Sequence, residues 1–212
     1  MAEFAEKLAG KFIVIDGPDG AGKSTQMAML SEWISRQGVS VTEARDPGGT
    51  VIGDKIRDIL LDRSHDGMTI GCELMLYQAS RAQLMGEVIE PAIQAGRCVL
   101  CDRWVSSTVA YQGAAGVHEP GEILQIYDWA VSERYPDLTV VLDLPAENGL
   151  ARLTGKPDRM EARSTEFHAK VRDSFLSQAD ASPERFTVVD ATKPIDQVHQ
   201  EIVSKIERHF AK

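Results

Sequence analysis

The stretch that begins at Gly17 matches the pattern G-x-x-x-x-G-K-[ST], whose residue types and spacing are those of a phosphate-binding loop. Gly17, Gly20 and Gly22 let backbone amides turn inward around phosphate oxygens, and the N-terminus of a following helix adds positive potential. Lys23 is long enough to reach the β and γ phosphates, and the Ser24 hydroxyl can bind Mg²⁺. The stretch therefore predicts a site for the phosphate chain of a nucleotide.

Strands and helices must hold this loop in place. The sequence has short β-branched runs at 11–16, 39–44, 97–102, 138–144 and 185–190, each followed by a helical stretch. This alternation predicts an α/β fold in which helices cover both faces of a five-stranded parallel sheet. The loop follows the first run and precedes a helical pattern, as the motif requires. We expect one domain over residues 1–212.

Composition restricts the partners and the location. The net charge of −9 argues against a general affinity for nucleic acid or for an anionic membrane surface. The first ten residues fit neither a secretory signal nor a transit peptide, so we expect a cytoplasmic protein. Cys98 and Cys101 lie three apart in a strand pattern and point to opposite faces, which argues against a metal or redox site. The five histidines lack ligand spacing and are expected at the surface or as helix caps.

A phosphate-binding loop alone does not separate kinases from GTPase switches or motor ATPases. The guanine-binding tetrapeptide N-K-x-D does not occur in the chain, and an acidic single domain offers no polymer-binding surface for a motor. A small kinase needs a second anion site. Asp102 and Arg103 follow a strand pattern at the edge where ligands bind, and they can hold a metal and an acceptor phosphate. A surface ion pair would also explain them, and Asp143 ends another strand, so the metal-binding acid stays open.

Seven segments together resemble the thymidylate kinase family, which phosphorylates dTMP. In chain order they are GPDGAGKST (17–25), RDPGGT (45–50), ELMLYQASRAQ (73–83), CDRWVSSTVAYQG (101–113), YPDLTVVLD (135–143), DRME (158–161) and VVDA (188–191). The resemblance implies a P-loop NTPase fold, ATP and dTMP as substrates, Mg²⁺ as cofactor and a homodimer. It implies Mg²⁺ contacts by Ser24 and Asp102. It implies ATP contacts by Gly17, Gly20, Gly22, Lys23, Ser24 and Thr25.

The resemblance also assigns the base end of the dTMP site. Tyr77 occupies the position of the ring that stacks on thymine, where phenylalanine is commoner. Arg81 is similar to the arginine that contacts the base carbonyl, and Ser107 and Gln112 match further base contacts. Without the family, Tyr77 and Tyr111 would be interpreted as ordinary core aromatics.

The resemblance also assigns residues to the sugar and phosphate end of the dTMP site. Asp19 matches the carboxylate that approaches the 3′-hydroxyl and the metal, and Tyr111 sits where the family excludes a ribose 2′-hydroxyl. Arg57 and Arg103 match the clamp on the dTMP phosphate. The bare pattern around Arg57 would equally suit a solvated arginine. The resemblance implies Lys23, Arg103, Asp19 and Arg152 as the catalytic residues.

Some positions depart from the family pattern. Gly20 replaces an arginine of one branch, so the chain is similar to the bacterial branch, whose cations come from a lid. Residues 153–165 are polar and are predicted to form an exposed, mobile loop. The lid is expected at 152–163. It offers Arg152, Lys156, Arg159 and Arg163 as cations, and the pattern does not choose among them. Asp46 replaces a glutamate, and Trp104 is bulkier than the usual tyrosine or histidine.

Two other functions remain open on the sequence. One is another small P-loop kinase with a different acceptor. The other is a regulatory protein that binds ATP and hydrolyses it slowly without an acceptor. Added dTMP separates the regulatory protein from an enzyme that phosphorylates dTMP, because it would leave the ADP production of the regulatory protein unchanged. A phosphate monoester acceptor is already anionic, so the kinase mechanism requires positioning and charge neutralisation rather than a strong base.

Overall fold

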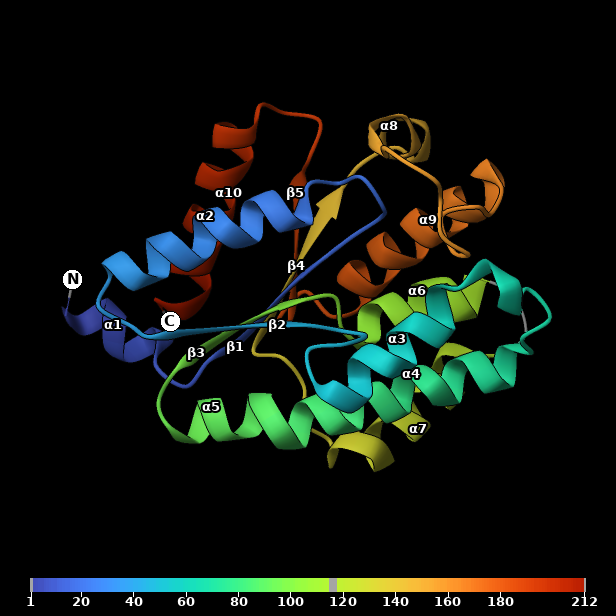
Figure 1. Cartoon of the computed structure of the whole chain (residues 1–212). Coiled ribbons are helices and arrows are strands. Elements are labelled where there is room, and N and C mark those ends of the chain that lie inside the picture. Colours follow the sequence, from blue (N-terminus) through green and yellow to red (C-terminus); the bar gives the residue numbers. More distant parts are fainter. Residues whose placement is uncertain (1, 115–117, 212) are drawn as a thin grey trace.

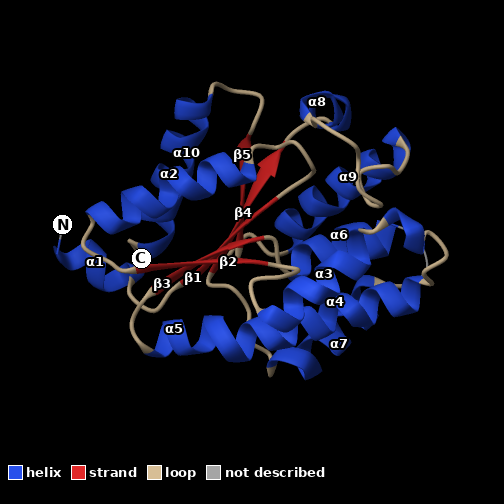
Figure 2. Cartoon of the chain, viewed as in Figure 1, coloured by secondary structure: helices blue, strands red, loops and turns tan. Residues whose placement is uncertain are grey.

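The strands form one parallel sheet in the order β2-β3-β1-β4-β5 (Figures 1 and 2). The structure is a computed structural model that describes residues 2–114 and 118–211. All five predicted strands are confirmed, with ends within two residues of the predicted runs. Their bounds are β1 (Phe12–Asp16), β2 (Val41–Arg45), β3 (Cys98–Asp102), β4 (Leu138–Asp143) and β5 (Phe186–Asp190).

Helices cover both faces of the sheet, as the alternating pattern predicts. On one face lie α1 (Ala2–Leu8), α2 (Lys23–Arg36) and α10 (Ile195–Phe210). On the other lie α4 (Ile70–Leu84), the π-helical turn η2 (Met85–Ile89), α5 (Glu90–Gln94), α6 (Val105–Ala114) and α7 (Pro120–Val131). The remaining elements are α3 (Val51–Leu61), the 3₁₀ turn η1 (Arg63–His65), α8 (Ala146–Arg152) and α9 (Thr165–Ala181).

The alternation of side chains along each strand builds two cores. In β1, Ile13 and Ile15 pack toward α2 and α10, whereas Val14 packs toward α4 and α6. Cys98 and Cys101 belong to opposite cores, as predicted, and burial raises the pKa of the Cys98 thiol to about 12. Within the described residues no group of three or more histidine, cysteine, aspartate or glutamate side chains is arranged to hold a metal ion.

Between α4 and α5 the chain forms the π-helical turn η2 over Met85–Ile89, and Pro91 lies in the first turn of α5. Two expectations need correction. His168 is buried on α9, not at the surface. The stretch predicted as an exposed loop includes the buried Arg159 and Met160.

Across the described ranges, none of the helices combines the length and apolar character needed to cross a membrane.

Candidate active site

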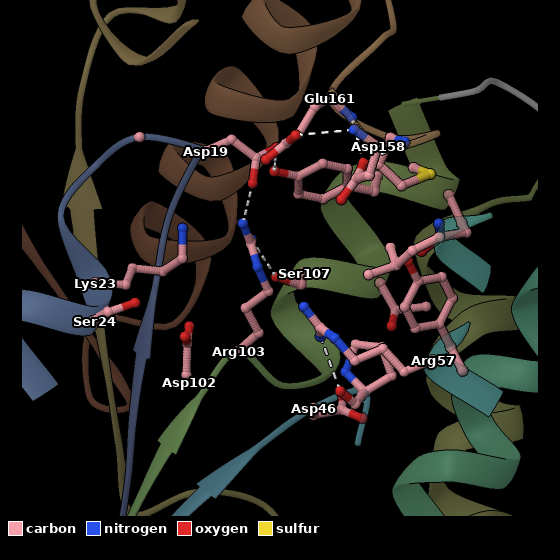
Figure 3. A pocket seen from close by; sticks show the side chains of 18 of the residues that line it. Asp19, Lys23, Ser24, Asp46, Arg57, Asp102, Arg103, Ser107, Asp158 and Glu161 are labelled. Carbon is pink, nitrogen blue, oxygen red and sulfur yellow. Dashed lines mark hydrogen bonds and ion pairs between the residues drawn. The ribbon is translucent and has the colours of Figure 1, made fainter. Parts of the chain in front are cut away.

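A cleft of about 250 Å³ opens at the carboxyl ends of β1, β2 and β3 (Figure 3). It lies where a parallel sheet with helices on both faces places ligands. Most of the predicted site residues line it. They are Asp19, Gly20, Lys23, Ser24, Arg57, Tyr77, Arg81, Asp102, Arg103, Ser107, Tyr111 and Gln112. Gly17, Gly22 and Thr25 frame the loop without lining the cleft, and Arg152 lies outside its lining.

The phosphate loop joins β1 to α2 with a backbone that requires glycine. Gly17 has φ 131, and a Cβ there would lie 2.5 Å from the carbonyl oxygen of Leu142. Gly20 has φ +74, and its Cβ would collide with the carbonyl of Gly149 on α8. The glycine at position 20, which departs from one branch of the family, is therefore demanded by the close approach of α8.

Lys23, the first residue of α2, folds back over the loop. Its Nζ donates to the carbonyl oxygens of Gly17 at 3.1 Å and Pro18 at 2.8 Å. Burial, together with the positive charge of Arg103, lowers the pKa of the Lys23 ammonium to about 8. The ammonium is thus held in the loop, close to the position where phosphate oxygens would meet it.

Arg103 and Asp19 form the centre of the cleft (Figure 3). Arg103 forms an ion pair with Asp19 and donates to Ser107 Oγ at 3.1 Å, and Tyr111 donates to Asp19 Oδ2 at 2.7 Å. Burial would raise the pKa of Asp19, but Arg103 and Lys23 outweigh it and lower that pKa. Arg103 has φ 68, a strained backbone for a non-glycine residue that is typical of functional sites.

Tyr111 contacts both a hydrophobic core and the cleft. Its ring packs edge-on against Phe167 and Phe175 in a core beside the cleft, with centroids 6.2 and 6.4 Å away. Its hydroxyl nevertheless reaches Asp19. The ring is therefore part of a core, while the hydroxyl lies at the cleft.

Asp16 is a buried carboxylate that sequence reasoning missed. Its Oδ1 accepts from the amide of Gly17 at 2.9 Å and from Ser107 Oγ at 2.7 Å, and its Oδ2 accepts from Ser106 Oγ at 2.6 Å. It therefore ties the first residue of the phosphate loop to the start of α6. The sequence signal that could have identified it is an acidic residue at the end of a buried strand, directly before the phosphate loop.

The two candidate metal-binding acids have different surroundings. Asp143 accepts two hydrogen bonds from Arg172, at 2.6 and 2.9 Å. Asp102 lines the cleft beside Ser24, and its buried Oδ1 has no hydrogen-bond partner among the described residues. A carboxylate and a hydroxyl oxygen suit Mg²⁺. Asp102 and Ser24 therefore fit the ion better than Asp143 does.

Arg81 lines the cleft and is fully buried. Its Nε donates to Asp46 Oδ2 at 2.8 Å, its Nη2 to Asp46 and Thr108, and its Nη1 to Gln78 Oε1 at 2.9 Å. A guanidinium has five N–H groups, so one Nη1 hydrogen has no partner among the described residues. Trp104 lies beneath, with its ring 5.3 Å from the Arg81 guanidinium, so its bulk fills the core and not the cleft.

The four predicted lid cations occupy different places. Arg152, the last residue of α8, approaches the carbonyl oxygen of Gly20 at 3.4 Å. Arg159 is buried against Glu73 on α4, which contradicts its role as a free lid cation. Lys156 and Arg163 are exposed and outside the cleft lining.

Other side chains complete the rim. Arg57 on α3 lines the cleft and donates to the carbonyl oxygen of Pro47 at 3.0 Å, and burial, followed by the charge of Arg45, lowers its pKa. Asp158 and Glu161 also line it, although the sequence assigned them no role. The sequence signal that could have identified them is their position in the DRME segment.

A central phosphate loop that faces a second group of arginines across a cleft defines a P-loop kinase with a donor and an acceptor subsite. The thymidylate kinase family model matches residues 15–202. The chain therefore belongs to the thymidylate kinase family.

Individual relatives agree with this assignment. The chain is 44% identical over 199 residues to the thymidylate kinase of Pseudomonas fluorescens, covering 93% of this chain and 95% of that one. It is 45% identical over 195 residues to that of Deinococcus radiodurans, covering 91% and 94%. A crystal structure of thymidylate kinase from Ehrlichia chaffeensis has a TM-score of 0.76 at 30% identity, covering 93% of this chain and 98% of that one.

Proposed function

We propose that the cleft binds ATP at the phosphate loop and dTMP between α3, α4 and α6, and that the protein transfers the γ-phosphoryl group to give ADP and dTDP. The opposed cations carry this proposal: Lys23 lies in the loop, and Arg57 and Arg103 line the acceptor side. Tyr77 and Arg81 then lie at the end of the cleft that would hold the base. The site contains an anion-binding group for each substrate.

The reaction requires an exchange of partners within the site. Lys23 leaves the loop carbonyls for phosphate oxygens, and Arg103 leaves Asp19 for the acceptor phosphate. Asp19 is then free to accept from the 3′-hydroxyl of the sugar. Ser24 and Asp102 would hold Mg²⁺, which when bound would neutralise further phosphate charge. No general base is needed, because the acceptor oxygen is already anionic.

Among the lid residues, we assign the catalytic cation to Arg152. Its guanidinium already approaches Gly20 in the phosphate loop, whereas Arg159 is committed to Glu73. Closure of residues 152–163 over the cleft would exclude water, which otherwise competes with dTMP for the phosphoryl group.

We also propose a cytoplasmic homodimer. Three large apolar side chains on α3, Val51, Ile52 and Ile59, are exposed, as is Met75 on the adjacent helix α4. Such a group on a surface is typical of a protein interface, and a second copy of the chain is the proposed occupant. The free thiols of the chain suit a reducing compartment.

A panel of acceptors tests the activity. We expect the rate of ADP formation from ATP and Mg²⁺ to be highest with dTMP, and lower with dUMP, which lacks the methyl contact. Assays with dCMP, AMP and shikimate cover the other small kinases. A higher rate with any of these would contradict the dTMP assignment. ADP formation that does not respond to dTMP would instead favour the regulatory ATPase.

The pH dependence of ATP use tests the place of Lys23. In the free protein its ammonium is charged below about pH 8 and neutral above it, so kcat/KM for ATP should fall as pH rises through about 8. Burial raises the pKa of Tyr77 and Tyr111, so these phenols stay neutral in that range. Profiles of the wild type and Lys23→Met would be compared, and the variant should lack this decline. A flat wild-type profile from about pH 7 to about pH 9.5 would count against the assignment.

A further inference from the structure

Glu73 on α4 is a buried carboxylate with two partners from distant parts of the chain. It is 3% exposed. Its Oε2 pairs with Nη2 of Arg159 at 2.5 Å, and its Oε1 accepts from Nε2 of Gln112 at 2.7 Å. Arg159, 7% exposed, also donates through Nε to the carbonyl oxygen of Leu60 at 2.8 Å. Glu73 thus connects the segment before α9 to α6, where Gln112 lines the cleft.

The chemistry of these groups sets the direction of the Gln112 amide. A carboxylate paired with a guanidinium only accepts hydrogen bonds, so Gln112 must turn its NH₂ group toward Glu73. Its Oε1 then has to face away from Glu73, and no donor among the described residues occupies that oxygen. Gln112 is 1% exposed, so its amide is confined between Glu73 and the cleft.

We propose that Glu73 is a positioning residue for base recognition. With its NH₂ group bound to Glu73, Gln112 presents an acceptor to the base, while Arg81 presents its one uncommitted Nη1 hydrogen as a donor. This pair matches the imide edge of thymine, where O4 accepts and N3–H donates. It opposes cytosine, in which N4 donates and N3 accepts. The inference rests on the proposed function and adds the source of its base selectivity.

The variant Glu73→Gln tests this role with almost no change in shape. The new amide can donate as well as accept, so it no longer forces the direction of Gln112. We expect the ratio of kcat/KM for dTMP to that for dCMP to fall on the order of ten- to hundredfold. The matched control is Glu87→Gln, which alters an exposed pair in which Gln83 Nε2 donates to Glu87 at 2.8 Å. The control should keep the wild-type ratio.

A double variant tests whether Glu73 acts by setting the direction of the side chain at position 112 or only by supporting the fold. In Glu73→Gln/Gln112→Glu, the amide introduced at position 73 accepts from Arg159 and donates to the carboxylate introduced at position 112. That carboxylate can only accept, so the base again meets an acceptor. We expect the double variant to keep the ratio within about threefold of the wild type. Gln112→Glu alone places two carboxylates face to face and should lose the ratio.

The outcomes are distinct. A folded Glu73→Gln that keeps the wild-type ratio overturns the inference, and so does an equal loss for dTMP and dCMP without recovery in the double variant. If Glu73→Gln does not fold, the double variant is compared with Gln112→Glu instead. Equal ratios of kcat/KM for dTMP to that for dCMP in these two variants also overturn the inference. A wild-type protein that does not phosphorylate dTMP would instead refute the proposed function, before any variant is compared.

Discussion

Replacement of Lys23 by alanine is expected to lower kcat about a thousandfold, roughly 4 kcal/mol of transition-state stabilisation. The ammonium lies in the phosphate loop, within 3.1 Å of two loop carbonyls, in a buried setting where a charge acts strongly on phosphate oxygens. Among the described residues no other lysine lines the cleft to replace it. Initial rates at saturating ATP and dTMP measure the effect.

The loss should occur without a loss of fold. Burial lowers the pKa of Lys23, which means that the folded protein disfavours its charged form at neutral pH. Removal of the ammonium therefore takes away a destabilising contribution, and thermal unfolding should show a midpoint no lower than that of the wild type. Lys170→Ala, at an exposed lysine on α9, is the matched control and should keep full activity. A Lys23→Ala protein with near-normal turnover would show that the loop does not hold the transferred phosphate.

Replacement of Arg103 by methionine is expected to have the second largest effect, a fall in kcat/KM for dTMP on the order of a thousandfold. The side chain lies between the phosphate loop and α6 and pairs with Asp19, Gly17 and Ser107. Methionine keeps the length but removes the planar group that can bind two phosphate oxygens at once. Arg103→Lys retains the charge without that geometry and should lose less.

The measurement is a set of initial rates with dTMP varied at saturating ATP. The KM for ATP should change far less than that for dTMP, because Lys23 and the loop amides remain. Arg172→Met removes an arginine that binds Asp143 through two hydrogen bonds outside the cleft, and it should leave the dTMP kinetics unaltered. An unchanged KM and kcat for dTMP in Arg103→Met would exclude this arginine from the acceptor clamp.

Much of the fold could be predicted because its signals are local. Each strand is a short β-branched run with a helical pattern after it, and five such runs in alternation permit few arrangements other than a parallel sheet. The phosphate loop is contiguous, so its glycines, Lys23 and Ser24 are recognised together, and the structure places them between β1 and α2. The family motifs then located most of the residues that line the cleft.

The partners of the charged groups could not be predicted in this way. Asp102 and Asp143 end similar strands, and only the structure distinguishes them: Asp102 lines the cleft, whereas Arg172 from α9 binds Asp143. Arg159 lies in the predicted lid and is positively charged, but it forms an ion pair with Glu73 on α4.

The sequence by itself therefore determined the class of protein, the sheet with its phosphate loop, and most of the predicted residues that line the cleft. Only the tertiary structure decided that Arg172 binds Asp143 while Asp102 Oδ1 has no partner among the described residues, that Glu73 binds Arg159, and why position 20 must be glycine. The physical reason is that a buried charge takes the partner that folding brings within hydrogen-bond distance. These partners come from elements far apart in the chain, so no local pattern specifies them.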